Sequence, residues 1–384
     1  MNKEQVSDPI VVLSEKENEE EAAREVCLKV KALLPKGVKL MLIFFTSHYR
    51  ASLLRRNIDV LLLPENILGI QSSSLIFEDK VIKRGIIGCC FARDGLGVEE
   101  SLLTDVDYEN VELILRRSML RLGGERSFTL SSLSPSVELG GYLRGVELFL
   151  KSAFKVLGIG FVKGHNSSIR YIVNSIVGKG LATIFLKGNI DVELRRVGGF
   201  LPLGRDFTIT RVSEKGDIIL EIENQPACFL YKRYLQEKFD FLKKTYLFQL
   251  YPLGVRVNGE YKLINVMEIL DDGSLLCLGK VAEGERCKVM IGTRDTLIAA
   301  AKKEAGYIKN NFSPCLVLLL YSLFRRDILK REAEREIKII KEILGKNFII
   351  IGLYCDYLVT SLPGLEEYTA YTVEGSSLSL ILIK

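Results

Sequence analysis

The sequence predicts a mixed α/β fold, a sheet-rich two-lobed α/β sandwich with β-α-β units at both ends and an antiparallel meander in the middle. Two observations predict it. Three segments share one pattern, in which an apolar strand with a polar carboxyl end leads through a helix to a strand that opens on an apolar residue and glycine. Between the second and third of them, residues 170–300 contain runs of alternating polarity that predict strands. Glycine-containing residue pairs join these runs, which is typical of β-hairpins.

The chain of 384 residues is long enough for two domains or lobes. We place an amino-terminal tail at residues 1–14, an amino-terminal lobe at 15–168 and a carboxyl-terminal lobe at 169–384. A hydrophobic content of 48% with 26% charged residues excludes the disordered and fibrous classes.

The elements of the first lobe follow in order. Residues 15–34 are rich in Ala, Glu and Lys, with an apolar stripe, and predict a helix. Residues 38–47 form a continuous apolar run, typical of a buried strand, and residues 85–95 are its expected partner. A further helix is expected at roughly 108–121.

The three repeated segments are β-α-β units with right-handed crossovers. They run from Leu40 to Ser74, from Arg126 to Ser168 and from Pro314 to Leu358. One helix, at about 226–242, interrupts the antiparallel strands between the second and third units.

The stretch VLGIGFVKGHNSS, Val156–Ser168, resembles a dinucleotide-binding loop at first sight. Such a loop must follow a strand and open a helix, so that the helix amino terminus faces the pyrophosphate. Here a helical segment precedes the glycines and a β-branched segment follows them, and the chain has no Walker A motif. The sequence therefore predicts no nucleotide cofactor.

Charge and cysteine usage exclude several other classes. The net charge of +5 is small and the basic runs are mixed with acids, so no nucleic acid is expected as a partner. The eight cysteines have no C-x-x-C spacing and there are only two histidines, so neither a metal site nor a disulfide framework is predicted. No signal peptide is visible and the apolar runs are too short to span a bilayer, so we expect a cytoplasmic protein without membrane insertion.

A set of motifs in the middle of the chain resembles the FIST domain, the F-box and intracellular signal transduction sensory module. The motifs are GGFLPLGRDFTITR (Gly198–Arg211), QPACFLYKRYL (Gln225–Leu235), YPLGV (Tyr251–Val255) and DDGSLLCLGKVAEGERCKV (Asp271–Val289). The resemblance covers about residues 20–384 and implies a stand-alone sensory domain that binds a small ligand, such as an amino acid or a related metabolite.

The sequence departs from the family pattern at the expected ligand site. The resemblance implies acidic residues where strands open, but Leu75 stands in place of Glu, His165 in place of Asp, and Tyr357 and Leu358 in place of Gly-Glu. Of a late Cys-x-Gly-Arg pattern only Arg326 is retained. Acids there would pair with ammonium groups, so their absence argues against amino-acid binding and leaves open another ligand or a degenerate pocket.

Both lines of reasoning converge on the carboxyl ends of the parallel strands, where open α/β sheets bind ligands. Hydroxyls, amides and free backbone N–H groups there suit a neutral or anionic small molecule. The predicted ligand-binding residues are Thr46, Ser47, His48, Gly69, Gln71, Ser72, Gly160, Gly164, His165, Asn166, Arg326, Tyr354 and Asp356.

Three hypotheses for function follow. The first is a non-enzymatic sensory module that binds an unidentified small molecule and acts on a signalling protein in trans, with no catalytic residue. The second is an enzyme that uses His48 or His165 as a base and a cysteine as nucleophile. The third is an adaptor that binds a protein through its surface helices.

Overall fold

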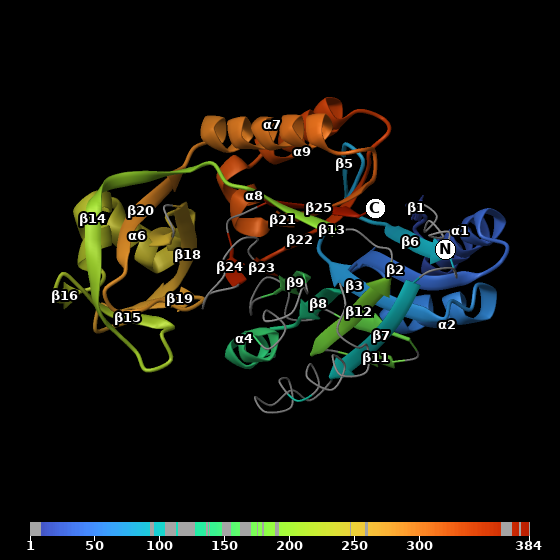
Figure 1. The fold of residues 1–384 in the computed structure, drawn as a ribbon, viewed down its shortest axis with the longest axis horizontal. Coiled ribbons are helices and arrows are strands. Elements are labelled where there is room, and N and C mark those ends of the chain that lie inside the picture. Colours follow the sequence, from blue (N-terminus) through green and yellow to red (C-terminus); the bar gives the residue numbers. More distant parts are fainter. Residues whose placement is uncertain are drawn as a thin grey trace.

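The computed structural model describes most of the chain. The described residues are 9–92, 96–103, 113, 127–135, 137, 139–147, 155–161, 170–174, 176–178, 180–188, 192–245, 247–257, 260–361, 371–375 and 378–383. They form a strand-rich mixed α/β fold, as the sequence predicts, with three mixed sheets and an antiparallel barrel (Figure 1).

The first sheet carries the amino-terminal β-α-β unit. Its strands, in spatial order, are β1 (Ile10–Ser14), β6 (Ile86–Ala92), β2 (Val38–Thr46), β3 (Asn66–Ser72), β10 (Tyr171–Val173) and β11 (Ile176–Gly178). Helices α1 (Glu19–Leu33) and α2 (Ala51–Leu61) pack against it. The Asn18 side chain caps α1 by accepting two backbone N–H groups, and three glutamates in the first turn favour the same end of the helix dipole. This confirms the predicted helix at 15–34 and the predicted strands at 38–47 and 85–95.

The second sheet carries the second unit. Its order is β24 (Tyr371–Glu374), β23 (Tyr357–Ser361), β9 (Lys155–Gly160), β8 (Ser127–Leu133), β12 (Leu181–Gly188) and β7 (Leu96–Leu103). Helix α4 (Leu139–Glu147) lies in the connection from β8 to β9. The helix predicted at 108–121 lies outside the described residues, apart from Leu113, as does the segment between α4 and β9.

The third sheet carries the third unit and connects to the barrel. Its order is β13 (Val192–Val197), β25 (Leu378–Ile383), β21 (Leu316–Ser322), β22 (Ile349–Cys355), β4 (Leu75–Phe77) and β5 (Lys80–Ile82). Three helices belong to it: α7 (Arg294–Asn311), α8 (Leu323–Leu329) and α9 (Glu332–Leu344). Helices α7 and α9 lie along one face of this sheet (Figure 1) and bury an apolar cluster there.

Each of these sheets contains a parallel pair formed by the strands of one predicted β-α-β unit. The pairs are β2–β3, β8–β9 and β21–β22, and each is in register to its carboxyl end. Side chains such as Leu42, Leu130 and Leu318 from the three sheets pack in one shared hydrophobic cluster. The three β-α-β units are therefore held together by a common core.

The barrel lies at the opposite end of the molecule from α1 and α2 (Figure 1). Its strands follow the order β14 (Phe200–Val212), β20 (Arg286–Gly292), β17 (Leu253–Val257), β18 (Glu260–Ile269), β19 (Leu275–Leu278) and β15 (Ile218–Ile222), and β14 also pairs with β15, which closes the ring. A short strand β16 (Gln225–Pro226) pairs with β15, and α5 (Phe229–Leu235), α6 (Lys238–Thr245) and the 3₁₀ helix η1 (Leu247–Leu250) follow it.

The prediction of one meander over residues 170–300 needs correction. Strands β10 and β11 join the first sheet and β12 joins the second, because each finds an edge or gap between strands distant in sequence. Strand β20 inserts between β14 and β17, so the later strands close a barrel instead of following chain order. The single helix predicted at about 226–242 is two helices, because Gln236 takes a φ of 41° and ends α5.

Candidate functional site

The predicted residues of the first unit lie at the carboxyl ends of β2 and β3, where Thr46 and Ser72 are register partners. Thr46 is fully buried, and its hydroxyl accepts the backbone N–H of Gly85 at 3.2 Å. Ser47 and His48, which follow it, are exposed. The His48 Nδ1 atom lies 3.4 Å from the Thr46 hydroxyl. The exposed pair is thus held beside a buried, hydrogen-bonded strand end.

Gln71 and Gly69 make contacts inside the first sheet. The backbone N–H of Arg170 donates to Gln71 Oε1 at 3.0 Å, and Gln71 Nε2 donates to the carbonyl of Tyr49 at 3.4 Å. A Cβ on Gly69 would lie 2.8 Å from the Cβ of Ile172. The amide of Gln71 therefore fixes the segment that follows β2 and the segment that precedes β10.

The third unit meets the first at Ser72. The Ser72 hydroxyl donates to the carbonyl of Tyr354, with the two oxygens 2.7 Å apart. The third unit also meets the second, because the backbone N–H of Asp356 donates to the carbonyl of Gly160 at 3.0 Å. Tyr354 and Asp356 are buried. The structure thus brings the strand ends of all three units to one junction.

Gly160 has a packing role at this junction. It pairs with Tyr357 of β23, and a Cβ on residue 160 would lie 2.0 Å from the tyrosine ring. Only glycine leaves room for that ring. The other predicted residues of this opening, Gly164, His165 and Asn166, lie outside the described residues.

Buried hydroxyls outside the predicted set of ligand-binding residues lie around the same strands. The Thr183 hydroxyl donates to that of Ser131 at 3.1 Å. Burial raises the pKa of Tyr142, Tyr171 and Tyr357 above the ordinary tyrosine value, so these side chains stay neutral. The one sequence signal was Tyr357 itself, which stands where the family pattern has glycine.

Arg326, the retained arginine of the family pattern, is partly exposed. Its Nη2 atom lies 3.0 Å from Asp327 Oδ1, and its Cζ atom lies 5.9 Å from the centroid of the Tyr354 ring. Its neighbour Arg325 is instead fully buried. The sequence offers no signal that distinguishes these two adjacent arginines, and reasoning from it missed Arg325.

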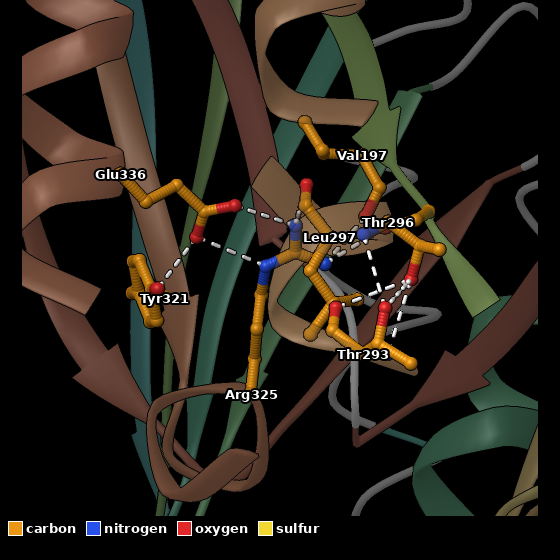
Figure 2. A network of polar contacts seen from close by, with 8 residues as sticks. Val197, Thr293, Thr296, Leu297, Tyr321, Arg325 and Glu336 are labelled. Carbon is orange, nitrogen blue, oxygen red and sulfur yellow. Dashed lines mark hydrogen bonds and ion pairs between the residues drawn. The ribbon is translucent and has the colours of Figure 1, made fainter. Parts of the chain in front are cut away.

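Arg325 is the centre of a buried polar network (Figure 2). Its Nε and Nη2 atoms donate to the carboxylate of Glu336, at 3.1 and 2.6 Å, and the hydroxyl of Tyr321 donates to the same carboxylate at 2.5 Å. Burial opposes the charged form of Arg325, but the facing carboxylate outweighs it and raises the pKa of the guanidinium. Burial, reinforced by Glu336, raises the pKa of Tyr321, so the phenol remains a donor.

The remaining donors of Arg325 bind backbone carbonyls at both connections to the barrel. Nη1 donates to Gly198 at 2.8 Å and to Val197 at 3.4 Å, where β13 leads out to β14. Nη2 donates to Leu297 at 2.9 Å, in α7, the helix that follows the return strand β20. All five N–H groups of the guanidinium are therefore used. One side chain ties both barrel connections to α8 and α9.

The cysteines are all buried free thiols. Burial raises the pKa of six of them, and those of Cys27 and Cys287 to about 12. Among the residues that the structure describes, no three His, Cys, Asp or Glu side chains gather as metal ligands. Within that same part of the chain, no helix is long and apolar enough to cross a membrane.

Comparison with known families gives two adjacent matches. The FIST N domain matches residues 39–225 and the FIST C domain matches residues 227–356. Together they include all three parallel strand pairs and the barrel. No curated protein matches the sequence significantly.

Proposed function

Since the chain belongs to the FIST family of sensory signalling domains, we propose that it binds a small metabolite at the junction of its three β-α-β units and relays that event to a signalling partner. We propose further that it acts without catalysing a reaction and that it works in the reducing cytoplasm, where its eight free thiols would persist.

The observation that carries the proposal is the meeting of the three strand ends. Ser72 bonds the carbonyl of Tyr354, and Asp356 bonds that of Gly160. In α/β sheets, ligands bind outside the carboxyl ends of parallel strands. A ligand at this junction would contact elements from all three sheets, so its binding would change how they are held together.

A line of contacts supports a relay from the junction to the barrel. The rings of Tyr354 and Tyr321 lie 5.1 Å apart between centroids. The Tyr321 hydroxyl bonds Glu336, which holds Arg325, and Arg325 holds both barrel connections. A displacement of Tyr354 would therefore be felt at the carbonyls of Val197, Gly198 and Leu297. The barrel is the element whose position we propose as the output.

The environment of the cysteines favours sensing over catalysis. A cysteine nucleophile acts as the thiolate and needs a lowered pKa and access to substrate. The thiols here are buried and the resolved pKa shifts are upward. His48 is exposed beside a threonine hydroxyl, without a carboxylate bonded to its ring within the described chain.

The test is a thermal-shift screen of the full chain with amino acids, organic acids and nucleotides, repeated on a variant. A ligand that binds only the native state raises the melting temperature. Ser47→Ala with His48→Ala changes only exposed side chains at the junction, so the unliganded protein should melt as the wild type does. We expect the ligand-induced shift to fall in this variant.

The matched control is Lys280→Ala, an exposed change on the barrel, which should keep the full shift. Binding at the junction is refuted if no compound of the three classes raises the melting temperature, or if the shift is the same in both variants. Turnover of a bound compound would refute the non-enzymatic assignment alone.

A further inference from the structure

A second group of functional side chains lies on the barrel, where two of the sequence motifs meet. Strand β14 has an irregular register with β20: Leu203 pairs with Val289 and Phe207 with Cys287. Residues 204–206 therefore stand opposite Lys288 alone. Such a bulge re-aims side chains, and bulges are frequent beside binding sites.

The bulge is built around Gly204, whose φ is +73°. A Cβ at this position would lie 1.8 Å from the hydroxyl oxygen of Tyr234 on α5. Both the left-handed backbone and the close approach require glycine. The motif LGRDF is thus shaped to bring the bulge against α5, which carries the motif FLYKRYL.

Two arginines converge on one ring at this contact. The Cζ atom of Arg205, in the bulge, lies 4.5 Å from the centroid of Phe207, and that of Arg233, on α5, lies 5.9 Å from it. The ring is buried, with Phe229 and Tyr234 packed edge-on at 5.8 and 6.1 Å. Because both distances are measured to the same centroid, the two Cζ atoms are separated by at most about 10 Å, roughly one Debye length at moderate salt.

No acid neutralises this pair in the described part of the chain. Neither Arg205 nor Arg233 has a carboxylate oxygen within 4.0 Å, and both side chains are exposed. The nearest acid in sequence, Asp206, faces Lys288 with 3.5 Å between their charged atoms. The remaining cation on α5, Lys232, lies over the separate ring of Phe239. The pair thus presents free forked donors to solvent.

We propose that Arg205 and Arg233 bind the phosphate group of a small phosphorylated molecule at the bulge of β14. One bidentate guanidinium already fills the two oxygens of a carboxylate. A phosphate monoester offers three acceptor oxygens and about two negative charges, and so has acceptors and charge for both forks. The site lies on the barrel, away from the strand-end junction, and does not depend on binding there.

The test is isothermal titration of the full chain with inorganic phosphate, a nucleoside monophosphate and acetate. We expect both phosphates to bind, with affinity that falls as ionic strength rises, and acetate to bind more weakly. Arg205→Ala with Arg233→Ala should weaken phosphate binding by about tenfold or more. Arg256→Ala, at an exposed arginine of the same barrel that has no ring contact within the described residues, should bind as the wild type does.

A charge-preserving variant separates geometry from charge and protects against loss of folding. Arg205→Lys with Arg233→Lys keeps both charges but removes the forked donors, so its affinity should lie between those of the wild type and the alanine variant. Equal affinity for the two phosphates would identify the phosphate group as the whole ligand, and tighter nucleotide binding would identify a phosphorylated metabolite. The proposal is overturned by absence of phosphate binding, by acetate binding as tightly as phosphate, or by unchanged binding in the alanine variant.

Discussion

Replacement of Arg325 by methionine removes the guanidinium that ties both barrel connections to the third sheet (Figure 2). Glu336 is fully buried, and of its partners among the described residues the hydroxyl of Tyr321 alone then remains. The carbonyls of Gly198 and Leu297 lose their donor. Loss of one partner of a buried ion pair costs about 3–5 kcal/mol of unfolding free energy. Glu336→Leu leaves the buried guanidinium of Arg325 without its carboxylate partner instead, and should lower the free energy of unfolding by a similar amount.

The two changes together should cost much less than their sum, because neither then leaves an uncompensated buried charge. We expect a coupling free energy of about 2–3 kcal/mol in the double-mutant cycle. The assay is urea unfolding followed by circular dichroism, with equal slopes against urea required of the four proteins. In Arg325→Met, the rate of amide hydrogen exchange should rise at residues 197–199, the connection from β13 to β14, more than it rises in the barrel strands.

The adjacent arginine supplies the matched control. Arg326 is partly exposed and its pair with Asp327 is a surface ion pair, so Arg326→Met should cost no more than about 1 kcal/mol. Equal costs for the Arg325 and Arg326 variants, or additive costs in the cycle, would refute the role assigned to Arg325.

Three further predictions concern burial and packing. Burial raises the pKa of Cys27 from 9.0 to about 12, so its contribution to stability is fully present below pH 9 and is lost as pH rises toward 12. In urea unfolding, the contribution of Cys27 to the free energy of unfolding should be roughly 1 kcal/mol lower at pH 10 than at pH 8. Gly160→Ala should destabilise the chain by about 1–3 kcal/mol because of the ring that faces it, whereas Gly306→Ala, in α7 with open space around it, should stabilise by up to about 1 kcal/mol in the same thermal melts. Ser72→Ala removes the bond to the carbonyl of Tyr354 and should cost about 1–2 kcal/mol, and an unchanged unfolding midpoint would argue against that contact.

The β-α-β units could be predicted from the sequence because their signals are local. A buried parallel strand is a continuous apolar run, and the helix that follows has its own period. Closure of the barrel could not be predicted, since the pairing of β20 with both β14 and β17 is non-local. The same limit applies to β10 and β12, which join sheets set by strands far away in the chain.

The candidate site was predictable to a similar extent. Ser72, Gly160 and Tyr354 were predicted from the glycine-containing second strand of each β-α-β unit. The structure brings these residues to one junction. Burial of Arg325 depends on a glutamate eleven residues later on another helix. No local pattern distinguishes it from the partly exposed Arg326, so this part of the network required the structure.

The departures from the family pattern are consistent with one another in physical terms. Leu75, in place of an acid, is fully buried in the shared core beside Leu353, where an unpaired carboxylate would cost several kcal/mol. Leu358 lies in the same core, and Tyr357 fills the space above Gly160. At these positions, side chains that pack in the core therefore stand where the family pattern has acids. The polar groups left at the junction are hydroxyls, an amide and Asp356. Asp356 is the single acid named at the junction, where the family pattern implies three, so under the proposed function the junction is less suited to a cationic ligand than that pattern is. Neutral metabolites should then give the larger thermal shifts, and a preference for cationic amines would contradict this reasoning.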